Sequence, residues 1–424
     1  ELAREDVPDS VCRIYGQDLR FGPQYLIPKP FDPRVVLREA KAVVAAAMDS
    51  GVARLQLDLD DYGRALESRL GASTGVTRLL LQKAGHKHSR IVFPEGEHRS
   101  VLSACRTLLD EDIATPILIG DPDRIAQRAA ELHVDLSRVE IAEPGRHPRA
   151  GFYVEELYRL RQRKGITHRE AEQALRDPNL FGALMVHLDD ADALVTGLTT
   201  HYSDTVRPLL QVIPMKPGVH KASGLYLALP ATGKKLYFLA DCTVNIDPSA
   251  EDLAEIALCA ADTARRFDVE PRVAFLSFSN FGSSRHPASD KVRRAVELVR
   301  HLDARLIADG EMQADTALVP ERVDSTYPFS LLKGGANVLI FPNLDAGNIA
   351  YKLLTSIGGA TVVGPILMGP SKPVHVLQRD ASVADIVNLA ALAAVEASEG
   401  SRWKGAAESK LMRRLLAEPL LTKA

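Results

Sequence analysis

Short apolar runs alternate with longer amphipathic segments from residue 88 to about residue 398. The runs have the length of buried strands and the segments the length of helices, which predicts an α/β fold with mostly parallel sheets. In such sheets, ligands bind beyond the carboxyl ends of the strands. The expected strands are 89–93, 116–120, 193–196, 235–240, 272–278, 337–341 and 361–367, and the expected helices lie near 98–111, 122–133, 151–164, 169–187, 249–266, 287–302, 344–357 and 384–398.

The length of 424 residues is too great for one core, so two or three domains are expected. A net charge of −3 gives no general attraction to nucleic acid or to an acidic membrane surface, so any anion site must be local. No apolar run approaches a membrane span, and no signal peptide is recognisable. We therefore expect neither nucleic acid nor membrane as a partner.

Cysteine and histidine spacings indicate neither disulfides nor a metal site. Cys12, Cys105, Cys242 and Cys259 form no CxxC pair, which favours free, buried thiols in a reducing cytoplasm. The twelve histidines form neither HxxxH nor HExxH, so a metal centre built by this chain is not expected. No GxGxxG follows a strand, and no GxSxG elbow is present.

The segment 197–208 follows a predicted strand and holds Ser203 and Arg207 at the start of a helix. Hydroxyls, backbone N–H groups and a guanidinium are what a phosphate or a thioester carbonyl needs. The alternative is that Ser203 caps the helix while Arg207 pairs with a carboxylate, and the residues alone favour neither. Arg161 lies in a basic helix end, where it would ordinarily stabilise the helix dipole.

Two further junctions carry polar side chains. Ser279 and Ser283 lie in a serine- and glycine-rich turn that could cradle a phosphate, although a plain polar loop is the simpler interpretation. Asn343 and Asn348 begin a helix, where they could orient a carbonyl or amide or only cap the helix.

The segment 373–385 places Arg379 ahead of Asp385 where a strand-and-loop region gives way to a helix. This arrangement could hold an anionic ligand beside a base. Gln378, just before the arginine, is neither a nucleophile nor a proton donor of useful pKa. Whether this site reacts with its ligand or only holds it is therefore open.

Five blocks occur in the order found in one known family: Arg90–Glu97, Ser203–Pro208, Ala240–Asn245, Asp309–Asp315 and Phe341–Tyr351. Over about 88–399 the chain resembles phosphate acetyltransferases, or phosphotransacetylases. The resemblance implies a two-lobed α/β fold, similar to isocitrate and isopropylmalate dehydrogenases, with the second lobe inserted in the first. It also implies coenzyme A bound between the lobes, dimers, and acetyl transfer between coenzyme A and phosphate.

A second resemblance covers the first residues of the chain. The proline-rich stretch 21–34 and the segment 47–53 resemble the end of the malic enzyme domain in large bacterial NADP-dependent malic enzymes. In those proteins a phosphotransacetylase-like domain follows on the same polypeptide. The resemblance implies that this chain, which opens at Glu1, is the C-terminal portion of such a hybrid. NADP and a divalent metal (Mg or Mn) would then belong only to an upstream domain, and this chain should not oxidise malate.

The expected domains follow from both resemblances. We expect a malic enzyme tail with connector over 1–72, a first lobe over 73–219 and 365–400, a second lobe over 220–364, and a C-terminal helical extension over 401–424. The partners implied are acetyl-coenzyme A as an allosteric ligand, the upstream malic enzyme domain, and further copies of the chain in a dimer or a multiple of it.

Matching the family residue by residue gives both agreements and departures. Arg379 and Asp385 match the arginine that binds phosphate and the acid that acts as base toward the thiol, while Arg161 and Arg207 match two further arginines of the cleft. The family's serine is Gln378 here. In addition, a family lysine is replaced by Phe281 and another cleft arginine by Ser356.

These departures favour a binding site over a catalytic one. The expected acetyl-coenzyme A site comprises Arg161, Ser203, Arg207, Ser279, Ser283, Asn343, Arg379 and Asp385, with no catalytic residue and with Gln378, Arg379 and Asp385 as degenerate transferase positions. The preferred interpretation is thus a regulatory acetyl-coenzyme A-binding domain of an NADP-dependent malic enzyme. An active phosphate acetyltransferase and a purely structural oligomerisation domain are the alternatives.

Overall fold

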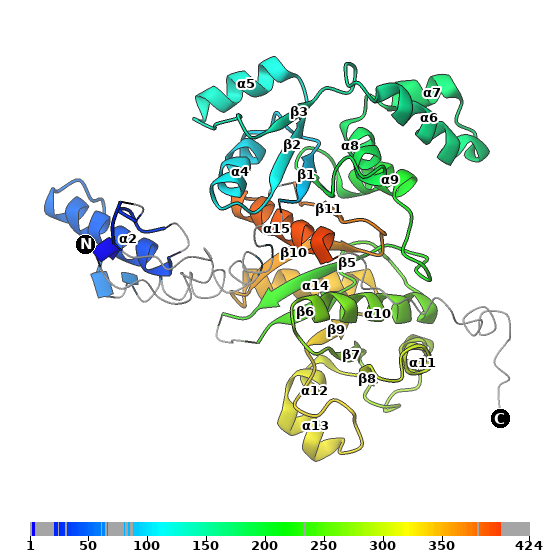
Figure 1. Ribbon diagram of the computed structural model, residues 1–424. Helices are drawn as coiled ribbons and strands as arrows, with labels where there is room; N and C mark the ends of the chain where they lie inside the picture. The colour runs from blue at the N-terminus through cyan, green and yellow to red at the C-terminus, as the bar shows by residue number, and fades with distance from the viewer. Residues whose placement is uncertain are drawn as a thin grey trace.

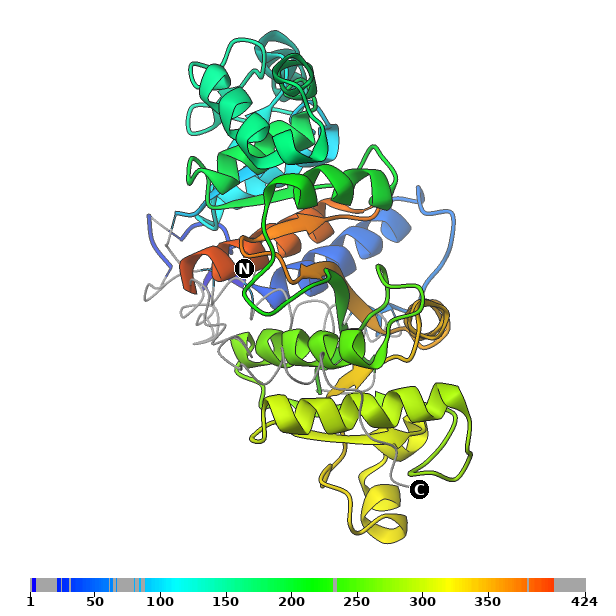
Figure 2. The same ribbon diagram turned by 90° about the vertical axis from the view of Figure 1, so that its right-hand side faces the viewer.

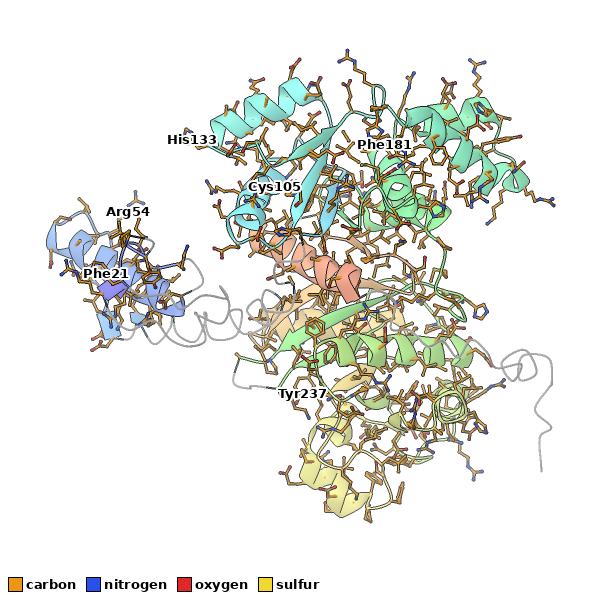
Figure 3. All side chains as sticks on the ribbon, in the orientation of Figure 1. Phe21, Arg54, Cys105, His133, Phe181 and Tyr237 are labelled. Atoms are coloured by element: carbon orange, nitrogen blue, oxygen red, sulfur yellow. The ribbon has the colours of Figure 1, made fainter. Side chains whose placement is uncertain are left out.

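The computed structural model describes residues 2–4, 21–23, 25–29, 32–60, 62–63, 66, 80, 84, 88–231, 235–379 and 381–399. Two sheets, each covered by helices, form two lobes (Figure 1). The predicted extension 401–424 and Cys12 lie outside the described residues. Cys105, Cys242 and Cys259 are free and buried, and Figure 3 places Cys105 within the first lobe.

The first lobe holds a five-stranded parallel sheet in the order β11-β4-β1-β2-β3. Helices α4 and α15 pack on one face, and α6, α8 and α9 cover the other. The strands are β1 (Arg90–Phe93), β2 (Thr115–Ile119), β3 (Glu140–Ala142), β4 (Ala193–Thr196) and β11 (Val374–Val376), and the helices are α4 (Arg99–Asp110), α5 (Pro122–Glu131), α6 (Ala150–Arg161), the 3-10 turn η2 (Gln162–Lys164), α7 (His168–Ala174), α8 (Pro178–His187), α9 (Tyr202–Val212) and α15 (Val383–Glu399).

The second lobe holds a six-stranded mixed sheet in the order β10-β5-β6-β9-β7-β8. The β10–β5 and β5–β6 pairs are antiparallel, and the remaining pairs are parallel. The strands are β5 (Ser223–Leu229), β6 (Tyr237–Ala240), β7 (Arg272–Leu276), β8 (Ile307–Met312), β9 (Val338–Ile340) and β10 (Thr361–Met368), and the helices are α10 (Ala250–Arg266), α11 (Pro287–Leu302), α12 (Ala314–Leu318), α13 (Pro320–Thr326) and α14 (Leu344–Ser356).

The chain order confirms the predicted two-lobed fold with the second lobe inserted in the first. All six strands of the second sheet lie between α9 and β11, and β11 returns to pair with β4 of the first sheet. The expected lobe boundary at 364/365 falls inside β10, whose paired residues on both sides of it belong to the second sheet. Figure 2 shows the two lobes in a perpendicular view.

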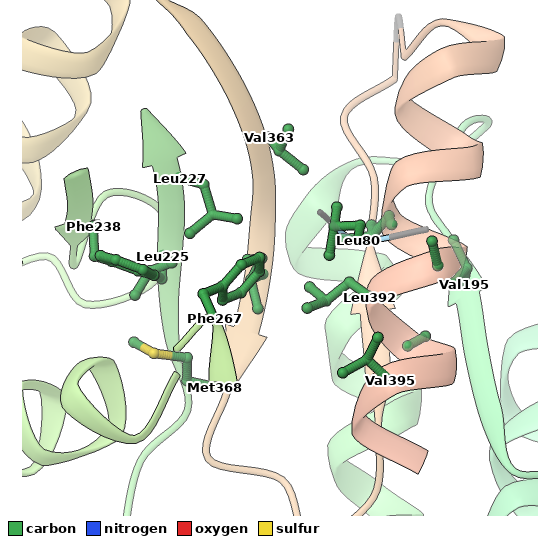
Figure 4. Packing of buried hydrophobic residues seen from close by; sticks show 14 of the residues in the cluster. Leu80, Val195, Leu225, Leu227, Phe238, Phe267, Val363, Met368, Leu392 and Val395 are labelled. Carbon is green, nitrogen blue, oxygen red and sulfur yellow. The ribbon is translucent and has the colours of Figure 1, made fainter. Parts of the chain in front are cut away.

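One apolar cluster crosses the junction between the lobes. It contains Leu392 and Val395 of α15 together with Val363 and Met368 of β10, all at most 4% exposed. Leu80, from the segment before the first strand, belongs to the same cluster, and Figure 4 shows it beside Leu392. The lobes are therefore joined by shared core as well as by the two chain crossings.

The N-terminal segment contains the 3-10 turn η1 (Leu2–Arg4) and helix α2 (Pro33–Asp49). Asp32 caps α2, and Pro33 occupies the first helical position, where its missing N–H costs nothing. Val43 on α2 is two-thirds exposed, and Val52 and Leu55 beyond the helix are more exposed still. Among the described helices, none is long and apolar enough to cross a membrane.

Candidate ligand-binding cleft

Three loops meet at the carboxyl edge of the first sheet, after β1, β4 and β11. Glu95, after β1, fastens the loop after β4: its carboxylate accepts from the backbone N–H groups of Gly197 at 3.0 Å and Thr199 at 2.9 Å. The Thr199 hydroxyl donates to the same carboxylate at 2.9 Å, whereas the Thr196 hydroxyl lies 3.3 Å from it and only 2.6 Å from the amide oxygen of Asn179. Gly197 has a φ of +121°, and a Cβ there would lie 2.6 Å from the Leu377 carbonyl oxygen, so this close approach requires glycine.

The loop after β4, which Glu95 holds in place, leads into α9, and α9 carries two of the predicted site residues. Ser203 and Arg207 on α9, with Arg161 at the end of α6, line one pocket of about 540 Å³. Thr243 and Val244, from the loop after β6, form its other wall. The structure thus brings three predicted residues together at a place where both lobes contribute.

The electrostatics of this pocket favour an anionic ligand. Within the described part of the chain, neither Arg161 nor Arg207 has a carboxylate partner. Ser203 does not cap α9, because His201 occupies the N-cap and no side chain makes the cap hydrogen bond. Helix capping by Ser203 and ion pairing by Arg207 are therefore not found among the described residues. The guanidinium groups of Arg161 and Arg207 lie beside the Ser203 hydroxyl without a neutralising carboxylate.

Two hydroxyls in the pocket wall were not predicted from the sequence. The oxygens of Tyr202 and Thr243 are buried, and no hydrogen bond of good geometry satisfies either from the described residues. Burial raises the pKa of Tyr202, so its hydroxyl stays protonated and can donate. The two hydroxyls lie close to each other and their oxygens have almost no accessible surface, so a ligand in the pocket would meet the side chains of Arg161, Ser203 and Arg207 rather than these oxygens.

Arg379 and Gln378 follow β11 and point to different partners. The Arg379 guanidinium lies 2.9 Å from Nδ1 of His201, at the start of α9. The Gln378 amide donates to the hydroxyl oxygens of Tyr226 on β5 and Tyr351 on α14, at 2.9 Å for Tyr351. Both tyrosines belong to the second lobe, so the loop after β11 touches both sides of the cleft.

Asp385 is engaged as a helix cap. It accepts from the backbone N–H of Ser382 at 2.9 Å and from the Ser382 hydroxyl at 2.8 Å, and its own N–H donates back to that hydroxyl at 3.2 Å. This reciprocal pattern is a capping box at the start of α15. Acting as a base would require Asp385 to leave these bonds or to share them.

The serine-rich turn forms a closed network within the second lobe. Ser279 is fully buried and donates to Glu311 at 3.0 Å, while Ser283 accepts from the Asn280 N–H at 2.9 Å. Burial alone would raise the pKa of Glu311, but backbone N–H groups and the Arg293 guanidinium lower it. The Glu311 carboxylate thus accepts hydrogen bonds from Ser279 and the Gly282 N–H, groups of the turn that we expected to be able to bind a phosphate.

Asn343 caps α14 by accepting from the Ala346 N–H at 3.0 Å, and Asn348 donates to the Cys242 carbonyl at 3.3 Å. Both amides thus have internal partners, but only Asn343 meets the capping alternative, since Asn348 lies inside α14 and bonds to the loop after β6.

Comparison with known proteins shows to which family the chain belongs. The family described as phosphate acetyl/butaryl transferase matches residues 76–394. The chain belongs to this family. The phosphate acetyltransferase of Bacillus subtilis is 42% identical over 74% of this chain and 97% of its own length. The phosphotransacetylase of Streptococcus pyogenes superposes with a TM-score of 0.74 at 39% identity, covering 77% of this chain and 98% of that one.

A second group of relatives extends further along the chain. The NADP-dependent malic enzyme of Escherichia coli K12 is 43% identical over 94% of this chain but only 53% of its own length. That of Rhizobium meliloti is 40% identical over 93% of this chain and 52% of its own. The chain thus spans about half the length of these relatives, and its similarity to them includes residues before the phosphate acetyl/butaryl transferase match.

The departures from the phosphate acetyl/butaryl transferase pattern have structural partners. Gln378 is tied to the two tyrosines. Phe281 packs at 5.0 Å between ring centroids against Tyr327 and at 4.9 Å against Phe329, within the second lobe. Ser356 is the exposed last residue of α14. These side chains therefore serve packing, cross-lobe bonding or the surface at the three positions where the resemblance implies a reactive or cationic group.

Proposed function

We propose that this chain is the regulatory domain of an NADP-dependent malic enzyme, which decarboxylates malate oxidatively to pyruvate, and that it binds acetyl-coenzyme A without transferring the acetyl group. NADP and the divalent metal (Mg or Mn) would act in an upstream domain. The relatives that cover 93–94% of this chain are malic enzymes, which supports this parentage.

The observation that carries the proposal is the pocket between α9, α6 and the loop after β6. Arg161 and Arg207 line it without carboxylate partners among the described residues, and the Ser203 hydroxyl lies beside them. Phosphate groups and a thioester carbonyl offer the acceptors that such donors need. Coenzyme A thioesters carry both.

The side chains that would drive acetyl transfer are either replaced by another residue type or bound to other residues of this chain. Acetyl transfer to phosphate passes through a tetrahedral centre with developing charge, and losing one donor to such a centre typically raises the barrier by ~2.7–4 kcal/mol. The hydroxyl expected at position 378 is an amide bound to Tyr226 and Tyr351, and Asp385 is held by Ser382. Binding energy that is not used in a transition state can instead favour one conformation over another.

Calorimetry with acetyl-coenzyme A tests the binding half of the proposal. Replacing Arg207 with alanine should weaken binding by about 10- to 100-fold, because a charge-assisted hydrogen bond contributes roughly 1.5–3 kcal/mol. Arg176→Ala, at an exposed arginine beyond α7, is the matched control and should leave the dissociation constant unchanged. No heat and no thermal shift with the wild-type chain would leave only a structural role.

A second candidate, an active phosphate acetyltransferase, is favoured by the presence of Arg379 and Asp385. Formation of acetyl phosphate from acetyl-coenzyme A and phosphate separates the two functions. Robust turnover by this chain would refute the regulatory-only proposal. Malate oxidation by the full-length protein, titrated with acetyl-coenzyme A, tests the regulation itself, and Arg207→Ala should shift that inhibition to higher ligand concentration.

The second lobe offers a surface for the proposed homo-oligomer. Ile349, Leu353 and Ile357 are spaced four residues apart along and just beyond α14, so they lie on one side, and they are between 52% and 82% exposed. An apolar strip of this kind is suited to a two-fold contact with a second copy. Leu353→Asp should therefore shift the sedimentation coefficient toward that of a smaller species, whereas Lys352→Asp, one residue away, should change it much less. An unchanged sedimentation coefficient for Leu353→Asp would place the contact elsewhere.

A further inference from the structure

The amide of Gln378 crosses from one lobe to the other. It lies on the loop after β11, which is anchored in the first lobe by the Leu377 N–H donating to the Thr196 carbonyl. Its Nε2 donates to the hydroxyls of Tyr226 and Tyr351, which come from β5 and α14 of the second lobe. One side chain thus uses both of its amide hydrogens on the far side of the cleft.

The two acceptors form a rigid platform. The rings of Tyr226 and Tyr351 stack with their centroids 4.2 Å apart and their planes 23° from parallel. The side chains are 1% and 5% exposed. Burial raises the pKa of Tyr226, so the hydroxyl remains neutral over the ordinary pH range. Because the platform cannot shift without disturbing the second lobe's core, whatever binds it is fixed relative to that lobe.

The neighbouring residue is turned the other way. Arg379 contacts His201, at the start of α9 in the first lobe. Consecutive side chains of the loop therefore bind opposite lobes.

We propose that Gln378 is a positioning residue, a cross-lobe clasp that holds the cleft at one width by joining the loop after β11 to the Tyr226–Tyr351 pair. The inference concerns the ligand-free chain and does not depend on the proposed function. It gives the residue a role other than the loss of a hydroxyl. Shorter side chains at position 378 leave the two tyrosine hydroxyls without this donor, so that only the shared apolar cluster and the two chain crossings still hold the lobes together and the cleft can widen.

The test measures the distance between the lobes directly. Asp123→Cys on α5 and Glu297→Cys on α11 place one spin label on each lobe at exposed positions, in a Cys12→Ser background. The remaining cysteines are buried and so should not be labelled. Pulsed dipolar spectroscopy then reports the distribution of distances without added ligand.

A narrow distribution is expected for the parent chain, and Gln378→Ala should add a second, separated population. Removal of two hydrogen bonds should raise the open-to-closed ratio by about 5- to 100-fold. Gln378→Asn keeps the amide but shortens the reach, so it should resemble alanine. Gln162→Ala is the control, since among the described residues that amide donates to the Arg159 carbonyl of its own helix segment and to no residue of the second lobe. An unchanged distribution in both Gln378 variants, with melting temperatures that show a folded chain, overturns the proposal.

A second set of variants tests whether Gln378 acts through Tyr226 and Tyr351. In a Tyr226→Phe, Tyr351→Phe background the acceptors are gone, and Gln378→Ala should have no further effect on the distance distribution. If alanine at position 378 still widens the distribution there, Gln378 acts through other partners and the clasp is refuted. Failure of acetyl-coenzyme A to bind the wild-type chain would refute the proposed function alone, because every measurement of the clasp is made without ligand.

Discussion

Replacing Glu95 with glutamine tests whether a single carboxylate holds the loop that leads into α9. One oxygen of Glu95 accepts from the Thr199 N–H and hydroxyl, and the other accepts from the Gly197 N–H. An amide has only one acceptor oxygen. Whichever way the substituted side chain turns, its NH₂ group faces a backbone N–H, so one bond becomes a donor–donor contact.

The size of the effect follows from these bonds. Hydrogen bonds to a charged acceptor contribute roughly 1.5–3 kcal/mol, and a buried donor left without a partner costs about 1–3 kcal/mol. The Gly197 N–H is the more enclosed of the two backbone donors, since Gly197 is packed against Leu377. We therefore expect the free energy of unfolding to fall by about 2–4 kcal/mol.

Urea denaturation followed by circular dichroism measures this loss, and acetyl-coenzyme A calorimetry reports whether α9 has shifted. The control is Glu131→Gln on α5, whose one ion pair, to Arg99 at 3.4 Å, is exposed and should contribute less than about 1 kcal/mol. A Glu95→Gln chain with wild-type stability would show that the loop does not depend on the carboxylate. Equal losses in both variants would mean that the effect is not specific to the loop.

Two further predictions concern the junction between the lobes. Leu392→Ala in the shared apolar cluster should reduce the free energy of unfolding by about 2–5 kcal/mol in urea denaturation, because it leaves a cavity where both lobes and Leu80 meet. A loss below about 1 kcal/mol would show that side chains at the junction repack freely. Burial alone would raise the pKa of Glu396, but the charges of His375 and Arg266 lower it to about 2. A depressed folded-state pKa stabilises the fold above the unfolded value, and this stabilisation is lost as the pH falls from about 4.5 toward 2. Glu396→Gln should thus flatten the stability–pH curve in that window, and a curve of unchanged slope would contradict the pairing.

The fold could largely be predicted because most strands are apolar runs of the expected length. All seven expected strands form, shifted by at most two residues at an end, but β3, β5, β8 and β11 were not expected, and the helix expected near 169–187 is divided into α7 and α8. The strand β8 was missed because its sequence, Ile307–Met312, contains two acids. Both acids are buried and form ion pairs with arginines of α11. Asp309 pairs with Arg300 at 2.6 Å, and Glu311 pairs with Arg293 at 3.2 Å. Such pairing between distant segments leaves no periodic signal in the sequence.

The candidate site was predictable where the family pattern is kept and not where it has changed. Arg161, Ser203 and Arg207 do meet at one pocket. The tyrosine pair that receives Gln378 could not be foreseen. Tyr226 lies on β5, a strand that was not predicted, and Tyr351 lies on a helix for which the sequence pointed only to Asn343 and Asn348. Which residues contact a ligand stays a prediction for all eight proposed positions.

The inserted second lobe has a consequence for synthesis on the ribosome. The strand β4 ends at Thr196, but its neighbour β11 does not begin until Val374. Until that late segment has emerged, the first sheet presents β4 as an unpaired edge, which is a template for association with other chains. The nascent protein must therefore pass through a long interval in which its first sheet lacks both β11 at one edge and α15 on one face. Slowing translation between residues 200 and 370 should therefore increase aggregation more than slowing it after residue 400.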